Sequence, residues 1–202
     1  MTKDKRATAR LDVAALRRGI TDKYRKVAVS SVGLFPYPTG EGSALDLGYP
    51  PTLVARIPST IRERFVGVGN PFVLGEVRPG EAVLDLGCGA GFDVFVAAQL
   101  VGPAGRVVGV DLSFEMLAVA AEARIEAGFP QIEFREAAVE ALPFPDASFD
   151  VALSNGVLNL IPDKLAALRE IFRILKPGGR LQACDMSLVG DEPPPDKAPW
   201  SD

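Results

Sequence analysis

A glycine-rich turn between a buried strand and a helix constrains this chain more than any other feature. The run VLDLGCGAG at residues 83–91 starts with aliphatic residues typical of a buried strand, and a helical pattern follows from Phe92 to Val101. Glycines in such a turn let the backbone approach a ligand closely, and the amides at a helix N-terminus favour anionic groups such as a carboxylate. The run therefore predicts a ligand-binding edge on a parallel sheet.

The residues after this turn alternate between strand and helix patterns. Strands are expected at 82–86, 106–111, 132–135, 149–154 and 180–186, and helices at 92–101, 113–127 and 163–176. Such alternation predicts an α/β fold, a Rossmann-like doubly wound parallel sheet with helices on both faces. The Pro-Gly-Gly at 177–179 is expected to end the last helix. Its apolar face is expected to consist of Leu165, Leu168, Phe172 and Leu175.

The N-terminal third has a different pattern and is expected to form a helical appendage. A first helix should reach about residue 31, with Leu11, Val13, Leu16 and Ile20 as its apolar stripe. The Gly/Pro-rich stretch 33–51 is expected to be a long loop, which Tyr37 either anchors or closes over a site. A short helix is expected at 52–65, and Asn70 should cap a turn that begins with Pro71.

These patterns divide the chain into three expected parts. Residues 1–78 form the N-terminal helices and loop, residues 79–190 the ligand-binding domain, and residues 191–202 a flexible tail. The tail is rich in proline, which cannot donate to a sheet ladder. The last strand is therefore expected to be an uncovered edge that lowers stability and promotes self-association.

Composition excludes several kinds of chemistry. The chain has no histidine, which excludes Ser-His-Asp and Cys-His catalysis and every histidine-bound metal, and no metal site is expected. The net charge of −4, without a basic run beyond the first ten residues, argues against a nucleic-acid partner. No apolar stretch is long enough for a bilayer, so no membrane partner is expected. Cys88 and Cys184 form no disulfide framework, and a cytoplasmic location is expected.

Two acids beside the glycine turn indicate which ligand it binds. Asp85 precedes the turn, and Asp111 ends the second strand, where an acid can accept hydrogen bonds from ribose hydroxyls. The dinucleotide fingerprint G-x-G-x-x-G is broken by Phe92 at its last position. Asp85 would also repel a pyrophosphate but would attract a cationic amino-acid cofactor. Since S-adenosylmethionine carries an ammonium, a sulfonium and a ribose, it is the expected cofactor.

Four segments carry a family resemblance: VLDLGCGAG (83–91), VVGVDLSFEML (107–117), EALPFPDASFDVALSN (140–155) and LKPGGRL (175–181). They resemble class I S-adenosylmethionine-dependent methyltransferases over about half the chain. The resemblance implies a set of cofactor-binding residues: Asp85, Gly87, Cys88, Gly89, Gly91, Asp111, Leu112, Val139, Glu140 and Asn155.

The resemblance also assigns parts of the cofactor to these residues. It places the glycine turn around the methionine part, Asp111 on the ribose, and Leu112 against the adenine. Val139 and Glu140 lie near the adenine edge, and Asn155 faces the transferred methyl group. Asn155 can equally well cap the strand end by bonding to nearby backbone. No catalytic residue is assigned, because in-line methyl transfer mainly requires a close and aligned acceptor.

A narrower resemblance is to arsenite methyltransferases, on residues 65–81, 89–111 and 154–164. The chain departs from them in three ways. Gly156 stands where those enzymes usually have a cysteine, and the acid that many class I enzymes have near Ala138 is missing. The chain also stops at Asp202, where the family continues with two further strands and a cysteine-bearing region.

The expected function is therefore an arsenite methyltransferase-like enzyme acting on an unidentified small-molecule acceptor. The alternative is a truncated cofactor-binding paralogue without activity. A nucleotide-dependent oxidoreductase is disfavoured by Phe92 and Asp85.

Overall fold

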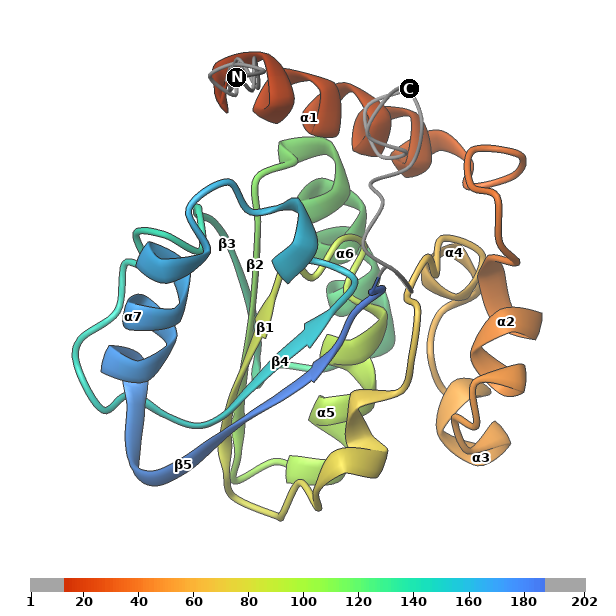
Figure 1. Cartoon of the computed structure of the whole chain (residues 1–202). Coiled ribbons are helices and arrows are strands. Elements are labelled where there is room, and N and C mark those ends of the chain that lie inside the picture. Colours follow the sequence, from red (N-terminus) through yellow and green to blue (C-terminus); the bar gives the residue numbers. More distant parts are fainter. Residues whose placement is uncertain (1–12, 188–202) are drawn as a thin grey trace, which may run out of the picture.

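A five-stranded parallel sheet forms the centre of the chain (Figure 1). The computed structural model describes residues 13–187. The strand order is β3-β2-β1-β4-β5, and the strands are β1 (Ala82–Leu86), β2 (Arg106–Asp111), β3 (Ile132–Glu136), β4 (Phe149–Asn155) and β5 (Leu175–Cys184). The order reverses direction between β1 and β4, so the two neighbouring strand ends can open a crevice for a ligand. The predicted Rossmann-like fold is confirmed.

Helices cover both faces of the sheet, as expected. The helices α5 (Phe92–Val101) and α6 (Phe114–Ala127) pack on one face and α7 (Lys164–Ile174) on the other (Figure 1). The Ser113 hydroxyl caps α6 by accepting from the Met116 amide, and Gly128 ends it in the left-handed conformation. Both ends lie where the sequence predicted them.

Each face of the sheet has its own apolar core. Phe95, Met116 and Val107 belong to the core under α5 and α6, which the N-terminal helices extend. Phe149, Ile171 and Ile174 belong to the core under α7. The central strands β1, β2 and β4 are mostly buried on both faces, which explains their largely aliphatic sequences.

The N-terminal region contains more helix than the sequence predicted. The first helix, α1 (Val13–Val29), is present, although Leu11 of its expected stripe lies outside the described residues. The predicted loop 33–51 instead includes α2 (Gly40–Asp46) and the start of α3 (Pro51–Val54). The predicted helix at 52–65 is also divided, because Pro58 separates α3 from α4 (Ser59–Arg62).

The prediction for the last helix was wrong in two respects. Ala167, Ile171 and Ile174 face the core, whereas Leu165, Leu168 and Phe172 of the expected apolar face are exposed. In this orientation of α7, Arg173 donates to the carbonyls of Leu142 and Phe144.

The last helix ends at Ile174, so the Pro-Gly-Gly at 177–179 does not end it as predicted but lies within β5. Gly178 has a φ of +80° there, and the β4–β5 register shifts beside it. The strand begins at Leu175 and ends at Cys184, not at residue 186 as predicted.

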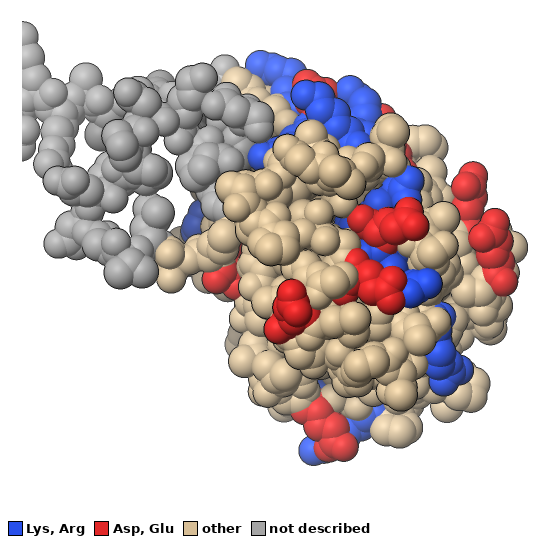
Figure 2. All heavy atoms as spheres, turned by 90° about the vertical axis from the view of Figure 1, so that its right-hand side faces the viewer, with Lys and Arg blue, Asp and Glu red and all other residues tan. Residues whose placement is uncertain are grey.

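Figure 2 shows the side of the molecule formed by α2, α3 and α4. Lys and Arg are most numerous toward the α1 end, and Asp and Glu are scattered among uncharged residues. Within residues 13–187, no helix combines the length and apolarity that crossing a membrane requires. The expected tail, 191–202, lies outside the described residues. In the described part, β5 pairs with β4 alone and forms an outer strand.

Candidate functional site

The glycine turn after β1 is close-packed at the carboxyl end of the sheet. Gly87 has a φ of +62°, and a Cβ there would lie 2.6 Å from a Val157 methyl carbon. Gly91 caps α5 with a φ of +93°, and a Cβ there would lie 3.0 Å from the Phe134 ring. Both positions therefore require glycine, for conformation and for space.

Asp111 ties this turn to the end of β2. Its two carboxylate oxygens accept hydrogen bonds from the amides of Gly89 and Ser113, each at 2.8 Å. Burial raises the pKa of Asp111, and these amide bonds oppose the rise. A carboxylate has about four acceptor positions, so Asp111 can still accept from a ligand hydroxyl.

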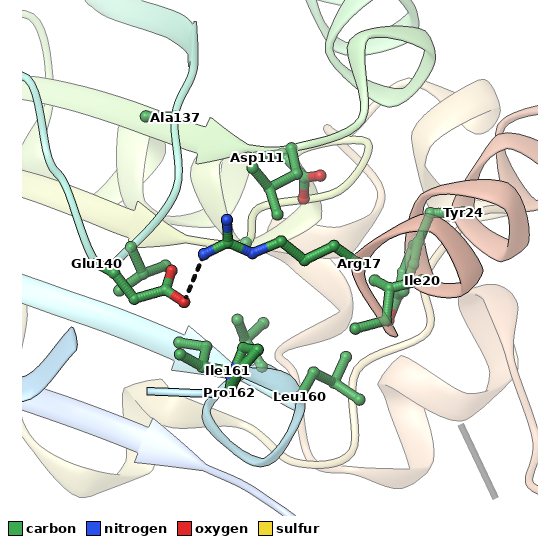
Figure 3. Close-up of a pocket in the computed structure, with 13 residues that line it drawn as sticks. Arg17, Ile20, Tyr24, Asp111, Ala137, Glu140, Leu160, Ile161 and Pro162 are labelled. Carbon is green, nitrogen blue, oxygen red and sulfur yellow. Dashed lines mark hydrogen bonds and ion pairs between the residues drawn. The ribbon is translucent and has the colours of Figure 1, made fainter. Parts of the chain in front are cut away.

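Beside Asp111 lies an apolar hollow that is partly open to solvent, the first hollow (Figure 3). Leu112, Val139 and Ile161 supply apolar walls, and Ile20 and Tyr24 of α1 close one side. The Arg17 guanidinium reaches across from α1 and forms a 3.0 Å ion pair with Glu140 (Figure 3). Such a hollow, apolar with a few polar groups at its edge, suits a flat heterocycle.

A second, more polar hollow continues from the first over the glycine turn. The two share Tyr24, Gly87 and Val157. The second is lined by Asp85, Asp93 and Asn155, and by the aromatic rings of Phe65 and Phe92. The shared residues make one elongated site with an apolar and a polar part.

Asp85 is the least compensated charge in the second hollow. Asp85 is only 2% exposed, and among the described residues no donor makes a hydrogen bond to its carboxylate. Burial raises the pKa of Asp85 well above its usual range, and the nearby Asp93 and Asp111 raise it further. A buried acid in this state is stabilised by a cation.

Asp93, on the first turn of α5, forms a buried hydrogen-bonded cluster with Tyr49 and Asn155. The Tyr49 hydroxyl donates to Asp93 Oδ1 at 2.6 Å, and Asn155 Nδ2 donates to Asp93 Oδ2 at 3.0 Å. Burial raises the pKa of Asp93 to about 6, while these two bonds act to lower it. Sequence reasoning missed Asp93 and Tyr49; the only signal was an acid two residues after Gly91.

Asn155 uses its side chain to hold the backbone of residues 68–69. Its Oδ1 accepts from the amides of Val68 and Gly69, and its Nδ2 also donates to the Gly69 carbonyl at 2.9 Å. Of the two roles left open for Asn155, the backbone-bonding one is present in the structure. Its amide lines the second hollow while it fixes the wall formed by that segment.

The helix α1 covers the junction of the two hollows and is anchored at several points. Arg64 donates to the carbonyls of Ala28 and Val29 at the end of α1, and Arg25 pairs with Glu115 of α6 at 2.7 Å. Tyr24 projects from α1 toward the hollows and is half-buried, and burial raises its pKa. The contribution of α1 to the site was not predicted from the sequence.

Tyr37 donates to the Val66 carbonyl at 3.3 Å and stacks near Phe35. It thus anchors its loop, one of the two roles considered for it. Burial raises its pKa to about 12.

Nine of the ten predicted cofactor residues line the two hollows, and the exception is Gly91. Asp111, Leu112, Val139 and Glu140 lie at the first hollow; Asp85, Cys88, Gly89 and Asn155 lie at the second, and Gly87 lies at both. Within residues 13–187, no three acidic or cysteine side chains are placed to hold a metal ion.

The two cysteines lie far apart in the sheet. The sulfur of Cys88, which follows β1, packs against Gly109 of β2. The sulfur of Cys184, the last residue of β5, packs against Gly69. Burial raises the pKa of both thiols. Since β1 and β4 lie between β2 and β5, the thiols are about three strand spacings, roughly 14 Å, apart.

Comparison with known proteins gives one family. A family model described as "Methyltransferase domain" matches residues 78–198, more than half of the chain. An arsenite methyltransferase of Halobacterium salinarum is 45% identical over 131 residues, which cover 65% of this chain and 33% of that protein. An arsenite methyltransferase of Aquipseudomonas alcaligenes is 39% identical over 179 residues, covering 85% of this chain and 51% of that protein.

A solved structure agrees with these matches. The crystal structure of an arsenic(III) S-adenosylmethionine methyltransferase from Chlamydomonas reinhardtii is 39% identical, with a TM-score of 0.62. The alignment covers 68% of this chain and 50% of that one. The chain thus spans between a third and about half of the length of these relatives.

Proposed function

We propose, for a chain that belongs to the class I S-adenosylmethionine-dependent methyltransferase family, that the two hollows bind S-adenosylmethionine and present its methyl group to a small-molecule acceptor. The observation that carries this proposal is the Asp85 carboxylate, which is buried and has no hydrogen-bond donor within residues 13–187, at the polar end of a site whose other end is apolar. A ligand with a cationic end and a heterocyclic end fits both parts.

The residues of the site fit the parts of this cofactor one by one. Leu112, Val139 and the edge formed by Glu140 would hold the adenine, and Asp111 would accept from the ribose hydroxyls. Around the methionine part would lie Asp85, Cys88, Gly89 and the shared Gly87. Gly91 would support the turn from behind, and Asn155 would act through the 68–69 segment that it holds.

When bound, the cofactor supplies a methyl group that its sulfonium activates for displacement. The chain has to align an acceptor with that carbon and exclude water. α1 covers the site from one side through Tyr24 and Ile20, and the 68–69 segment forms a second wall. A general base is needed only for an acceptor that still carries a proton when it attacks, so a chain without histidine suits this reaction.

Calorimetry with S-adenosylmethionine, S-adenosylhomocysteine and NADH tests the cofactor. We expect the first two to bind and NADH not to bind. Asp111→Ala should weaken binding by about 1–3 kcal/mol, because ribose hydroxyls lose an acceptor. Saturable NADH binding without a response to the other two ligands would overturn the proposal.

Turnover against a panel of acceptors separates an enzyme from the alternative, a cofactor-binding paralogue without activity. Relatives named demethylmenaquinone methyltransferase and arsenite methyltransferase suggest the acceptors to include. Methylation of none of them, with cofactor binding intact, would favour the paralogue.

For arsenite itself we propose weak or absent methylation by this chain alone. Trivalent arsenic binds several thiolates, as soft metal ions do. Gly156 carries no thiol, and Cys88 and Cys184 are too far apart to share one arsenic atom. Turnover of arsenite at ordinary enzymatic rates would refute this proposal.

We also propose that β5 can pair with a second copy of the chain, in a cytoplasmic setting. Its outer backbone groups have no strand partner within the described residues. Sedimentation at increasing concentration tests this, and a monodisperse monomer throughout would rule it out.

A further inference from the structure

The second hollow contains more acidic groups than the described residues pair with cations. Asp85 and Asp93 both line it, and Arg64 is the only arginine or lysine that does. The Arg64 guanidinium is already bound to the carbonyls of Ala28, Val29 and Thr60. At the first hollow, Arg17 is likewise paired with Glu140.

Asp93 is held in place but not neutralised. Its two donors, the Tyr49 hydroxyl and the Asn155 amide, are uncharged groups that position both carboxylate oxygens. Neutral hydrogen bonds offset only part of the cost of burying a charge, and a cation offsets much more. The unpartnered carboxylate of Asp85 lines the same hollow, so a positive ligand group there would stabilise two acids at once.

Methyl transfer changes the charge of the ligand in this hollow. The acceptor's lone pair forms the new bond to the methyl carbon, and the electron pair of the broken sulfur–carbon bond stays on sulfur. The positive sulfonium becomes a neutral thioether, while the ammonium and carboxylate of the ligand are unchanged. The attraction between the hollow and its ligand therefore falls when the methyl group leaves.

We propose, building on the proposed function, that Asp93 is a specificity-determining residue that acts with Asp85 to make the site prefer the cationic methyl donor over its neutral product. The negative charge held by Tyr49 and Asn155 would weaken product binding relative to substrate binding and so favour exchange of the two.

Preference for a cation also predicts how binding depends on pH. Four titratable groups interact electrostatically with Asp93: Asp85 of β1, Cys88 of the turn, Tyr49 before α3 and Cys184 of β5. Burial raises the pKa of both thiols and of Tyr49, so these three groups stay neutral below pH 7. Since a protonated Asp93 must lose its proton to face a cation, affinity for S-adenosylmethionine should rise from pH 5 to 7.

The test measures the ratio of the dissociation constants of S-adenosylhomocysteine and S-adenosylmethionine by calorimetry at pH 7.5. Three variants are compared with the parent: Asp93→Asn, Tyr49→Phe and the control Asp46→Asn, an exposed acid of α2 that lines neither hollow. We expect the parent to prefer the cationic ligand. Asp93→Asn should reduce that preference on the order of tenfold, which corresponds to about 1.4 kcal/mol.

The remaining variants separate charge from shape. Tyr49→Phe removes one hydrogen bond but keeps the carboxylate, so it should leave the ratio within about twofold of the parent. A stable analogue that bears an amine in place of the sulfonium should follow S-adenosylmethionine in every variant.

Equal loss of affinity for all three ligands in Asp93→Asn would overturn the proposal and assign Asp93 a merely structural role. If the parent bound neither S-adenosylmethionine nor its product, the proposed function itself would fail, which is a distinguishable result.

Discussion

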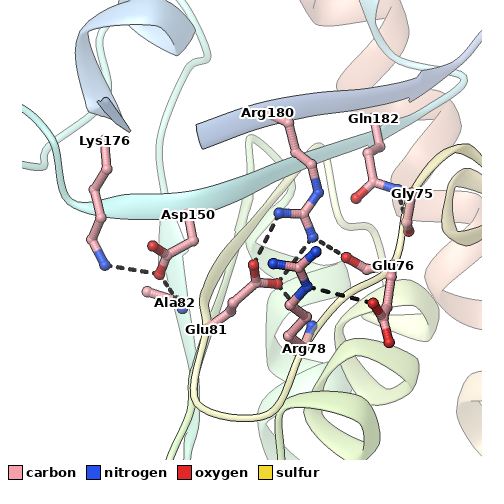
Figure 4. A network of polar contacts seen from close by, with 9 residues as sticks. All are labelled: Gly75, Glu76, Arg78, Glu81, Ala82, Asp150, Lys176, Arg180 and Gln182. Carbon is pink, nitrogen blue, oxygen red and sulfur yellow. Dashed lines mark hydrogen bonds and ion pairs between the residues drawn. The ribbon is translucent and has the colours of Figure 1, made fainter. Parts of the chain in front are cut away.

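The two ends of the sheet use acidic residues in opposite ways. At the amino end, Glu81 accepts two hydrogen bonds from Arg180 of β5, and Asp150 of β4 accepts from Lys176 and from the Ala82 amide (Figure 4). The Arg180 bonds lower the pKa of Glu81. Burial acts to raise the pKa of Asp150, but the bonds from Lys176 and Ala82 outweigh it, and the pKa is lowered.

At the carboxyl end, three acids pair with no cation among the described residues. Asp85, Asp93 and Asp111 are bonded to neutral groups or to none, and burial raises the pKa of all three. Acidic residues therefore stabilise the scaffold through ion pairs at the amino end. At the carboxyl end their burial without a cation is unfavourable, and a cationic ligand can offset that cost.

Asp85→Asn should cause the largest change of the three, a loss of affinity for S-adenosylmethionine without a loss of stability. Losing one partner of a buried charge pair costs about 2–4 kcal/mol of binding free energy, so affinity for S-adenosylmethionine should fall steeply. The free energy of unfolding of the ligand-free protein should stay equal or rise, because an uncompensated buried charge is removed. Calorimetry and urea denaturation of the same samples measure both. A variant that lost stability and kept its affinity would reverse the comparison.

The pH dependence of stability should differ between the two ends. Burial raises the pKa of Asp93 from 3.8 to about 6, so the ligand-free protein should lose about 2–3 kcal/mol from this group as the pH rises from about 4 to above 6. The amino-end acids, whose pKa values are lowered, act oppositely: their contribution is complete above the usual carboxyl range and is lost on acidification.

Denaturation across pH 4 to 8 tests this, with Asp93→Asn as the matched variant. We expect the variant's stability to change less than the parent's between pH 4 and 6.5. Parallel curves for the two proteins would show that Asp93 carries no unfavourable charge in the ligand-free state.

The fold of the central sheet could be predicted because its signals are local. The strand 82–86 and the helix 92–101 were predicted with the bounds that the structure has. The prediction failed where tertiary contacts decide. α2 is held by long-range bonds such as that from the Gly40 amide to the Phe65 carbonyl, and α7 is rotated so that Ala167, Ile171 and Ile174 face the core while Arg173 donates to carbonyls of the preceding loop.

The site was predictable only in its glycine turn and strand-end acids. Asp85 and Asp111 stand next to strand patterns, and the structure brings them to one elongated hollow. Tyr49 and Asp93 are 44 residues apart, and Arg17 and Glu140 are 123 residues apart. No pattern in a single sequence pairs such residues, because their proximity results from packing the N-terminal helices over the sheet.

Arg180→Met should cause the smallest of the three predicted changes in free energy. It should lower the free energy of unfolding and leave ligand affinity unchanged. The Arg180 and Glu81 side chains are 31% and 16% exposed, and Arg180 also donates to the Glu76 carbonyl. Without Arg180, Glu81 keeps a partly buried charge with fewer donors, which should cost about 1–2 kcal/mol of unfolding free energy. Affinity for S-adenosylmethionine should stay unchanged, because Arg180 lines neither hollow.

The matched control is Arg78→Met, because Arg78 pairs with Glu76 at 3.4 Å while 69% exposed and should contribute little. The sign of the pH effect gives a second check. Because Arg180 lowers the pKa of Glu81, the stability difference between the parent and Arg180→Met should be complete at neutral pH. It should shrink as Glu81 becomes protonated in acid. A difference that persisted undiminished in acid would mean that Arg180 stabilises β5 through packing of its side-chain stem. Packing, and not charge pairing with Glu81, would then account for the stabilisation at the amino end of the sheet.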